Sequence, residues 1–313
     1  MSASTPDVPV WLPRQDGRVA VITGANSGIG WEAARMLAAV GARVVMACRR
    51  PEAAKAAVIR ITEQVPDANI DVVQVDLAEL ASVSAGAAAV RELLGELRID
   101  FLINNAGVLS APTRAVTADA FELQMGVNHL GHFAWTLDLI DQLAARARVV
   151  QVASLAHKVG RMNFDDLLWL KSYNGWAAYA RSKLANLLFV SALDRRLAQR
   201  AGKARKRAIA VACHPGYTAT GLQAGFARKG SILEQVTRLG NAVLAQSAAA
   251  GAEPTVYAAV SSHVSGDDYV GPANFFQMRG PPVKVSRTAA ACDTTAQERL
   301  WTESEALTGR KWT

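Results

Sequence analysis

Short runs of apolar residues alternate with longer alanine-rich segments along most of this chain. Valine and isoleucine follow one another within these runs instead of alternating with polar residues, which indicates strands that are buried on both faces. The six runs occupy residues 18–23, 42–47, 70–75, 100–104, 148–153 and 208–213. Segments of helical composition separate them, including residues 29–40, 52–63 and 179–200. Strands buried in this way, with a helix after each, predict a parallel sheet covered by helices.

The fold class predicted from this alternation is α/β, a Rossmann-type doubly wound parallel sheet of about seven strands flanked by helices. No proline-, glycine- or serine-rich linker and no repeat divides the chain, so residues 1–313 are expected to form a single domain. The rhythm breaks at about residues 217–252, which we interpret as an insertion that covers the substrate. Residues from about 277 to 313 form a C-terminal extension.

Composition excludes several classes of protein. Half of the residues are hydrophobic and 19% are charged, so a disordered chain is excluded. The three cysteines form no CxxC pair, which argues against a disulfide framework or a thiolate metal site. No secretion signal and no uninterrupted apolar stretch of about 18 residues is present. A soluble protein of a reducing compartment, the cytoplasm, is therefore expected.

A glycine-rich loop follows the first predicted strand. The sequence TGANSGIG at residues 23–30 carries glycines at positions 24, 28 and 30 and leads directly into a helix. Such a loop lets the backbone approach a pyrophosphate, whose charge the helix N-terminus stabilises. The spacing is GxxxGxG and not the commoner GxGxxG, and a simple glycine-rich turn is the alternative.

The end of the second strand bears on which dinucleotide would bind. Arg49 and Arg50 stand where an acidic residue would bind the 2′-hydroxyl of NAD. A guanidinium suits the 2′-phosphate of NADP instead, so NADP is the predicted preference and NAD the alternative. An arginine pair on an ordinary solvated loop would look the same.

A tyrosine and a lysine lie four residues apart in the long predicted helix. Tyr179 and Lys183 therefore share one helix face. An ammonium group near a phenol lowers the pKa of that phenol, which allows the pair to act as a general acid/base. A YxxxK pair alone is more often a surface feature. Here Ser154, residues 104–107, Asn128 and residues 215–216 also fall at or beside strand carboxyl ends, where ligands bind in open α/β sheets.

Taken in order, these motifs resemble the short-chain dehydrogenase/reductase family from about residue 18 to residue 276. The matching segments are TGANSGIG (23–30), Asp76-Leu77, NNAG (104–107), Asn128, Ser154, YARSK (179–183) and HPGYTAT (214–220). VNHLGHF (127–133), SLAH (154–157) and YARSKLAN (179–186) look like the retinol-dehydrogenase-like branch. RLWTESEALTG (299–309) is similar to uncharacterised bacterial oxidoreductases of that branch.

The resemblance implies a role for each catalytic residue. Tyr179 would exchange a proton with the substrate oxygen, and Lys183 would lower the pKa of Tyr179 and hold the nicotinamide ribose. Ser154 would hydrogen-bond the substrate oxygen, and Asn128 would position a water that relays protons to Lys183. No metal is implied.

The resemblance also implies the cofactor-binding set. Asp76 and Leu77 would frame the adenine, and Asn104 and Gly107 the adenosine ribose and the diphosphate. The complete set is Gly24, Asn26, Ser27, Gly28, Ile29, Gly30, Arg49, Asp76, Leu77, Asn104, Ala106, Gly107, Tyr179, Lys183, Pro215, Gly216, Thr218 and Thr220. Two departures from the family pattern are Ala153, where many relatives have serine, and Ser27, where many NADP-dependent relatives have arginine or lysine. The second departure leaves Arg49 as the main determinant of NADP preference.

The expected function is that of an NADP(H)-dependent oxidoreductase interconverting an alcohol and an aldehyde or ketone. Aromatic residues between Ser154 and Tyr179 either line an apolar substrate cleft or pack the connection, and they favour a hydrophobic substrate. They are Phe164, Trp169, Tyr173 and Trp176. His132 and His157 are interpreted as packing or supporting residues. The alternative function is a non-catalytic NADP-binding sensor or scaffold, which would have no chemical need for the complete catalytic set.

The net charge of +7 comes mostly from one short segment. Residues 194–207 contain seven basic residues and one acid, a local charge of 7 − 1 = +6 at the end of the long helix. No base-reading or stacking residues accompany it, so a nucleic-acid partner is not expected. We interpret the cluster as a solvated helix end on the side opposite the cofactor, with a peripheral membrane or partner contact as the alternative. The oligomeric state stays open.

Overall fold

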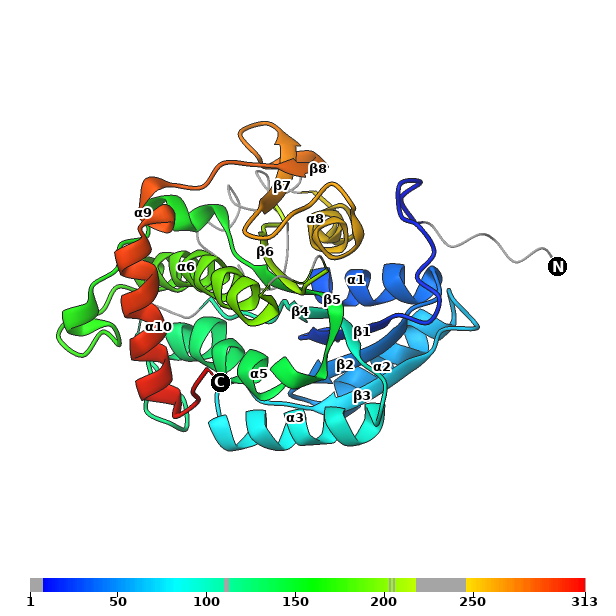
Figure 1. Cartoon of the computed structure of the whole chain (residues 1–313), viewed down its shortest axis with the longest axis horizontal. Coiled ribbons are helices and arrows are strands. Elements are labelled where there is room, and N and C mark those ends of the chain that lie inside the picture. The colour runs from blue at the N-terminus through cyan, green and yellow to red at the C-terminus, as the bar shows by residue number, and fades with distance from the viewer. Residues whose placement is uncertain (1–7, 110–112, 203, 205, 218–245, 313) are drawn as a thin grey trace, which may run out of the picture.

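The computed structural model describes residues 8–109, 113–202, 204, 206–217 and 246–312. One eight-stranded sheet runs through the molecule in the order β3-β2-β1-β4-β5-β6-β7-β8 (Figure 1). The strands are β1 (Val19–Thr23), β2 (Arg43–Cys48), β3 (Ile70–Gln74), β4 (Ile99–Asn104), β5 (Leu143–Val152), β6 (Ile209–Cys213), β7 (Tyr269–Asn274) and β8 (Arg279–Lys284). Neighbouring strands from β3 to β7 are parallel, and β8 pairs antiparallel with β7.

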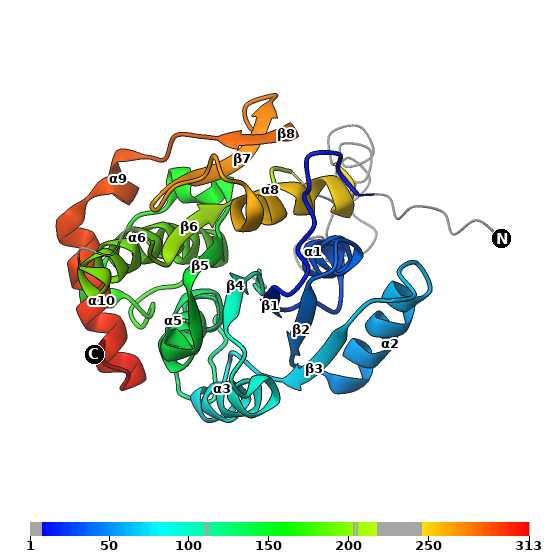
Figure 2. The same ribbon diagram turned by 45° about the vertical axis from the view of Figure 1, so that its right-hand side comes forward.

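Helices cover both faces of this sheet (Figures 1 and 2). The helices α1 (Gly28–Ala39), α2 (Pro51–Thr62) and α8 (Ala248–Val260) share a hydrophobic core with one face. The helices α3 (Leu80–Leu94), α5 (Gly131–Asp138) and α6 (Gly175–Ala201) pack on the other. The short helices α4 (Leu123–Met125) and α9 (Ala289–Cys292) and the longer α10 (Thr294–Thr308) complete the described helices.

Strand β1 is apolar up to its last residue, Thr23, because both of its faces are covered. In β1, Val19 and Val21 belong to the core beneath α3, α5 and α6, whereas Ala20 and Ile22 belong to the core beneath α1 and α8. All five residues of β1 are buried. The predicted doubly wound parallel sheet is therefore confirmed, with the antiparallel β8 making eight strands where about seven were expected.

The direction of winding reverses between β1 and β4. The chain proceeds outward from β1 to β2 and β3, then crosses back to place β4 on the other side of β1. The loops that leave the carboxyl ends of β1 and β4 consequently diverge, and such a switch point is where open α/β sheets bind ligands. The fold thus brings the glycine loop and the NNAG segment together.

The structure describes little of the segment 217–252 and nearly all of the C-terminal extension. In the segment 217–252, only Tyr217 and residues 246–252 are described, and residues 248–252 begin α8; the rest of the predicted insertion lies outside the described residues. The C-terminal extension supplies β8, α9 and α10. Helix α10 lies along the outside of α6 and α5, where Trp301 contacts Phe133 and Phe189 (Figure 1).

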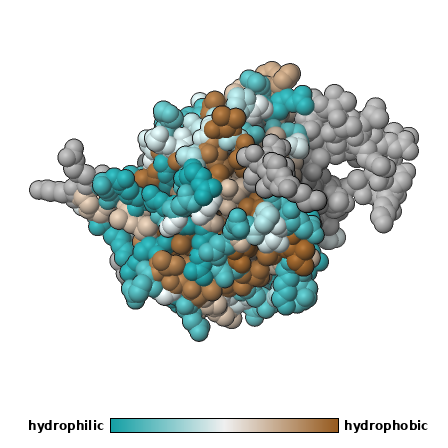
Figure 3. All heavy atoms as spheres, turned by 90° about the vertical axis from the view of Figure 1, so that its right-hand side faces the viewer, coloured by the Kyte–Doolittle hydropathy of each residue, from teal (hydrophilic) through white to brown (hydrophobic). Residues whose placement is uncertain are grey.

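The surface carries mixed chemistry. On the face seen in Figure 3, hydrophobic side chains are interspersed with hydrophilic ones. Among the residues that the structure describes, no helix combines the length and the hydropathy that a membrane crossing requires.

Candidate functional site

The glycine loop follows β1 and opens α1 as the sequence predicted. Gly24 and Gly28 have φ values of +67° and +56°, in the left-handed region that favours glycine. A Cβ on Gly30 would overlap the Asn105 side chain and the Gly24 carbonyl. Ser27 caps α1 with its backbone but makes no side-chain capping bond, so the first N–H groups of α1 stay available to an anion. The loop therefore fits the pyrophosphate of a dinucleotide.

The loops after β2 and β3 carry Arg49, Asp76 and Leu77, which the resemblance assigned to the adenosine side of the cofactor. Arg49 directly follows β2, and its side chain is exposed. Asp76 accepts a hydrogen bond from the Ala78 N–H at 2.9 Å, and Leu77 is buried beside it. Within the described part of the chain, Arg49 makes no ion pair, which leaves its guanidinium available to a phosphate.

The NNAG segment after β4 braces the glycine loop. Asn105 Nδ2 donates to the Thr23 carbonyl at 2.9 Å, and the Asn105 and Ala106 N–H groups donate to Thr23 Oγ1. The Asn104 side chain is completely buried and donates to Thr136 and Gln151. Asn104 thus supports the sheet edge from inside through its side chain.

Asn128 lies in a π-helical turn, Gly126–Leu130, between α4 and α5. Its Oδ1 accepts from the Val108 N–H at 2.7 Å, and its Nδ2 donates to the Val108 carbonyl at 3.0 Å and to Ser182 Oγ at 2.9 Å. Both Nδ2 hydrogens are therefore used by protein groups, and Oδ1 can accept one further hydrogen bond. The Asn128 side chain joins the segment after Gly107 to α6.

Ser154 and Tyr179 meet at the carboxyl end of β5. Ser154 caps a short 3-10 turn, Leu155–Val159, and its Oγ accepts from the Ala156 N–H at 3.2 Å. The serine hydroxyl hydrogen thus stays free to donate, and Ser154 hydrogen-bonds the Tyr179 phenol. Burial raises the pKa of Tyr179, and the bond from Ser154 only partly opposes this rise. The sequence predicted a lowered pKa for Tyr179, but in the structure burial dominates.

Lys183 lies one helical turn beyond Tyr179 and is almost completely buried. Its Nζ is 5.7 Å from the centre of the Tyr179 ring and donates to the Val152 carbonyl at 3.0 Å. Burial lowers the pKa of Lys183 to about 8. A Cβ on Gly107 would lie 3.4 Å from both Lys183 Nζ and Asn128 Oδ1. All four predicted catalytic residues therefore gather at one edge of the sheet, next to the NNAG turn.

The segment after β6 completes this edge. Gly216 has a φ of +70°, and a Cβ there would overlap the Met278 carbonyl, so the turn needs glycine. The Tyr217 N–H donates to the same carbonyl at 2.9 Å, which ties the Pro215–Gly216 turn to the loop between β7 and β8. Thr218 and Thr220 lie outside the described residues.

The aromatic residues between Ser154 and Tyr179 mostly pack the connection. Trp169 stacks on the Arg181 guanidinium, whose carbon is 3.8 Å from the ring centre, and Tyr173 donates to the buried Glu122. Phe164 packs against the core. Trp176 is half exposed with its ring centre 5.8 Å from that of Tyr179, so it alone of the four stands beside the catalytic group.

A polar network links the two halves of the site and was missed in the sequence. His132 bridges Thr23 Oγ1 at 2.9 Å and the Asn128 carbonyl at 3.1 Å, and Gln151 reaches the same carbonyl at 3.5 Å. Burial lowers the pKa of His132 to about 3, so the ring is neutral. The signal for this network was a polar side chain at the end of, or within, an otherwise apolar run: Thr23 in RVAVIT and Gln151 in RVVQVA.

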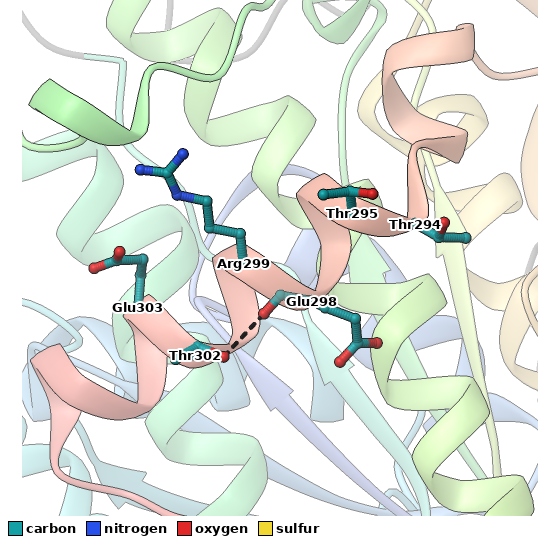
Figure 4. Close-up of a pocket in the computed structure, with 6 residues that line it drawn as sticks. All are labelled: Thr294, Thr295, Glu298, Arg299, Thr302 and Glu303. Carbon is teal, nitrogen blue, oxygen red and sulfur yellow. Dashed lines mark hydrogen bonds between the residues drawn. The ribbon is translucent and has the colours of Figure 1, made fainter.

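Two surface features lie away from this edge. A cavity of about 590 Å³ is lined only by residues of α10, as Figure 4 shows, and none of them is a predicted site residue. In the basic cluster, Arg195 and Arg196 pair with Glu298, Arg200 with Asp141, and Arg207 with Asp194. Four of the seven basic residues of the cluster are therefore paired with acids.

Comparison with known proteins agrees with the geometry. The family described as short chain dehydrogenase matches residues 18–230. Human retinol dehydrogenase 13 is 38% identical over 301 residues, covering 94% of this chain and 85% of that protein. Polyprenol dehydrogenase from Danio rerio is 33% identical over 306 residues, covering 96% and 89%.

Solved structures share the fold. An uncharacterized protein from Mycobacterium paratuberculosis has 39% identity and a TM-score of 0.78, over 96% of this chain and 97% of that chain. A short chain dehydrogenase from Burkholderia cenocepacia in complex with NADP has 23% identity and a TM-score of 0.63, over 82% and 96%. The chain belongs to the short-chain dehydrogenase/reductase family of NAD(P)-dependent oxidoreductases.

Proposed function

We propose that this protein is an NADP(H)-dependent oxidoreductase that interconverts a hydrophobic alcohol and its aldehyde or ketone. The observation that carries the proposal is the meeting of Ser154, Tyr179 and Lys183 at the sheet edge beside the glycine loop. The names of two relatives, retinol dehydrogenase and polyprenol dehydrogenase, designate alcohols with long apolar bodies. They support a substrate of that class.

The residues around the glycine loop fit NADP. Gly24 and Gly28 supply the positive φ of the turn, Gly30 packs against Asn105 where α1 starts, and the exposed Arg49 offers a cation for a 2′-phosphate. When bound, the nicotinamide would accept or supply the hydride. The protein supplies orientation and proton transfer.

Ser154 and Tyr179 would act on the substrate oxygen. Ser154 Oγ accepts from Ala156 and its hydroxyl bonds the Tyr179 phenol; a carbonyl oxygen bound beside the phenol would take over the serine hydrogen. Because the pKa of Tyr179 lies above its ordinary value, the phenol is protonated at neutral pH. It would therefore donate its proton to the oxygen of a carbonyl undergoing reduction, and would take the proton back from an alcohol undergoing oxidation.

Lys183 and Asn128 would support this step. The Lys183 ammonium, fixed by the Val152 carbonyl, places a positive charge near the ring of Tyr179. That charge stabilises the phenolate left after proton donation. Asn128 holds the segment after Gly107 against α6, which keeps the cofactor side and the catalytic helix at a fixed separation.

Cofactor preference is tested by Arg49→Asp, with Arg50→Asp as the matched control on the adjacent exposed position. Titrations of NADPH and NADH, followed by fluorescence, should show about a tenfold or greater loss of NADPH affinity in the Arg49 variant, since a phosphate would then face a carboxylate. NADH affinity should change little, and the control should keep the wild-type ratio. An unchanged ratio in the Arg49 variant would remove this residue from the proposal.

Substrate class is tested with linear aldehydes of increasing length. Each buried methylene is worth about 0.8 kcal/mol, so kcat/KM should rise about three- to fourfold per carbon until the apolar site is filled. A flat series, or one that favours the shortest aldehydes, would contradict a hydrophobic substrate while leaving the oxidoreductase chemistry in place.

A further inference from the structure

Three buried side chains beside the catalytic serine have no role in the proposed chemistry. They are His157 in the turn after β5, His214 directly after β6, and Tyr269 at the start of β7. The two histidines are completely buried, and Tyr269 is 2% exposed. The Tyr269 ring centre lies 5.4 Å from that of His157 and 5.1 Å from that of His214. The three rings therefore form one cluster.

Each histidine binds the backbone of a functional segment. His157 Nδ1 lies 2.7 Å from the carbonyl oxygen of Ser154. His214 Nδ1 accepts from the Gly216 N–H at 3.1 Å. The cluster thus touches the catalytic serine on one side and the Pro215–Gly216 turn on the other.

These bonds determine which ring nitrogen carries the hydrogen. A carbonyl only accepts, so His157 must donate from Nδ1. A backbone N–H only donates, so Nδ1 of His214 must be unprotonated. Burial lowers the pKa of both rings, that of His214 to about 3, so both are neutral. Nε2 of His157 is therefore an acceptor, and Nε2 of His214 carries a hydrogen.

The outer atoms of the cluster form a complementary set. By interatomic distance, Nε2 of His157, Nε2 of His214 and the Tyr269 hydroxyl make no hydrogen bond among the residues described, although the Gln277 side chain, whose buried Oε1 is also unpaired, interacts with His214. The three atoms supply one acceptor, one donor and one hydroxyl that can do both. Buried polar groups rarely stay unpaired, because each lost bond costs about 1–3 kcal/mol. A Tyr269 hydroxyl or a shared water placed between the two rings would satisfy all three atoms.

The geometry points to a positioning role: we propose that the His157–Tyr269–His214 cluster holds Ser154 and the Pro215–Gly216 turn at a fixed position relative to each other. His157 is the positioning residue for the serine. The inference rests on the proposed function, since it concerns the same active site. His157 clamps the Ser154 carbonyl with both its ring Nδ1 and its backbone N–H. The clamp fixes the backbone from which the Ser154 hydroxyl reaches Tyr179. The charged groups that face the cluster are Lys158 and Arg287, with the thiol of Cys213 close by.

The first test substitutes His157 by leucine and by asparagine. Asparagine places an N–H donor near the position of Nδ1, whereas leucine removes the donor. His157→Leu should lower kcat about tenfold or more, because small displacements of a catalytic group are costly, while NADPH affinity stays within about twofold. It should also move the acid limb of the kcat–pH profile for alcohol oxidation to higher pH. The sign follows from the Ser154 bond, which lowers the pKa of Tyr179 and would be weakened.

His157→Asn should restore both kcat and the pH profile, and a purely structural role would not produce that pattern. The matched control is His263→Leu, at an exposed position just after the end of α8, which should change neither. A His157→Leu variant with wild-type kcat and pH profile would overturn the positioning role.

The second test does not depend on turnover, so it separates failure of the cluster from failure of the proposed function. Long-range ¹⁵N–¹H NMR spectra should show His157 with its hydrogen on Nδ1 and His214 with its hydrogen on Nε2, both neutral at pH 7. Tyr269→Phe should shift both sets of signals and lower Tm. If both histidines carry the hydrogen on the same ring nitrogen, the proposed cluster is wrong. A Tyr269→Phe protein of equal or greater stability, with unshifted histidine signals, would likewise show that the three side chains do not interact.

Discussion

The packing of α10 against α5 and α6 makes a quantitative prediction for Trp301→Ala. Trp301 is 3% exposed, and its ring centre lies 5.0 Å from that of Phe133 and 6.0 Å from that of Phe189. Arg196 covers the other side of the ring, with its guanidinium carbon 4.0 Å from the ring centre. Truncating a buried tryptophan costs about 3–5 kcal/mol of unfolding free energy. The loss of this one side chain should therefore be large.

The expected change in Tm follows from the size of the protein. At about 2.1 cal/mol/K of unfolding entropy per residue, 313 residues give about 0.66 kcal/mol/K, so Tm should fall by about 5–8 °C. Calorimetry or circular dichroism at a fixed scan rate measures the shift. Trp176→Ala is the matched control because that tryptophan is half exposed, and its Tm should change by about 1 °C or less. A Trp301→Ala protein that melts within about 2 °C of the wild type would refute the packing of α10 described above.

Three further predictions concern the glycine loop, the stability of the protein at acid pH, and the contact between Gly271 and His214. Gly30→Ala should weaken NADPH binding about tenfold or more, because the added Cβ overlaps Asn105. A dissociation constant for NADPH within about twofold of the wild-type value would contradict this. The arginines beside Glu298, Arg196 foremost, lower its pKa to about 2, so the stability it contributes is complete above its unfolded pKa of about 4.5 and is lost as the pH falls toward 2. The Tm difference between wild type and Glu298→Gln should thus narrow from pH 6 to about pH 3, and a constant difference would argue against the ion pair. Gly271→Ala should displace the His214 ring, which its Cβ would overlap, and weaken NADPH binding while far-ultraviolet circular dichroism stays unchanged.

The sheet could be predicted from sequence because each strand is marked by a run of neighbouring apolar residues. Each buried strand is a run of apolar residues, and in β1 the two side-chain faces enter two different cores, which explains why the run does not alternate. The glycine loop and the Tyr179–Lys183 pair were predictable because a turn needing positive φ and a four-residue helical spacing are both visible in sequence.

The features of the site that the sequence did not reveal depend on contacts between residues far apart in the chain. Asn104 ends the fourth run, where a cofactor residue is expected, but Thr136 and Gln151, which bond its side chain inside the core, come from other elements. The direction of the Tyr179 pKa shift depends on burial, which no spacing reveals. The basic segment 194–207 shows its charge in sequence, but not that Glu298 of α10 pairs with two of its arginines.

The central claim is that Tyr179 transfers the proton at the substrate oxygen, and Tyr179→Phe tests it most directly. The measurement pairs an NADPH binding titration with steady-state turnover of an aldehyde that the wild type reduces. The variant should bind NADPH within about twofold of wild type and lose about 10²- to 10⁴-fold in kcat, the usual contribution of a general acid. A variant that binds NADPH and retains kcat within about threefold of wild type would contradict the account.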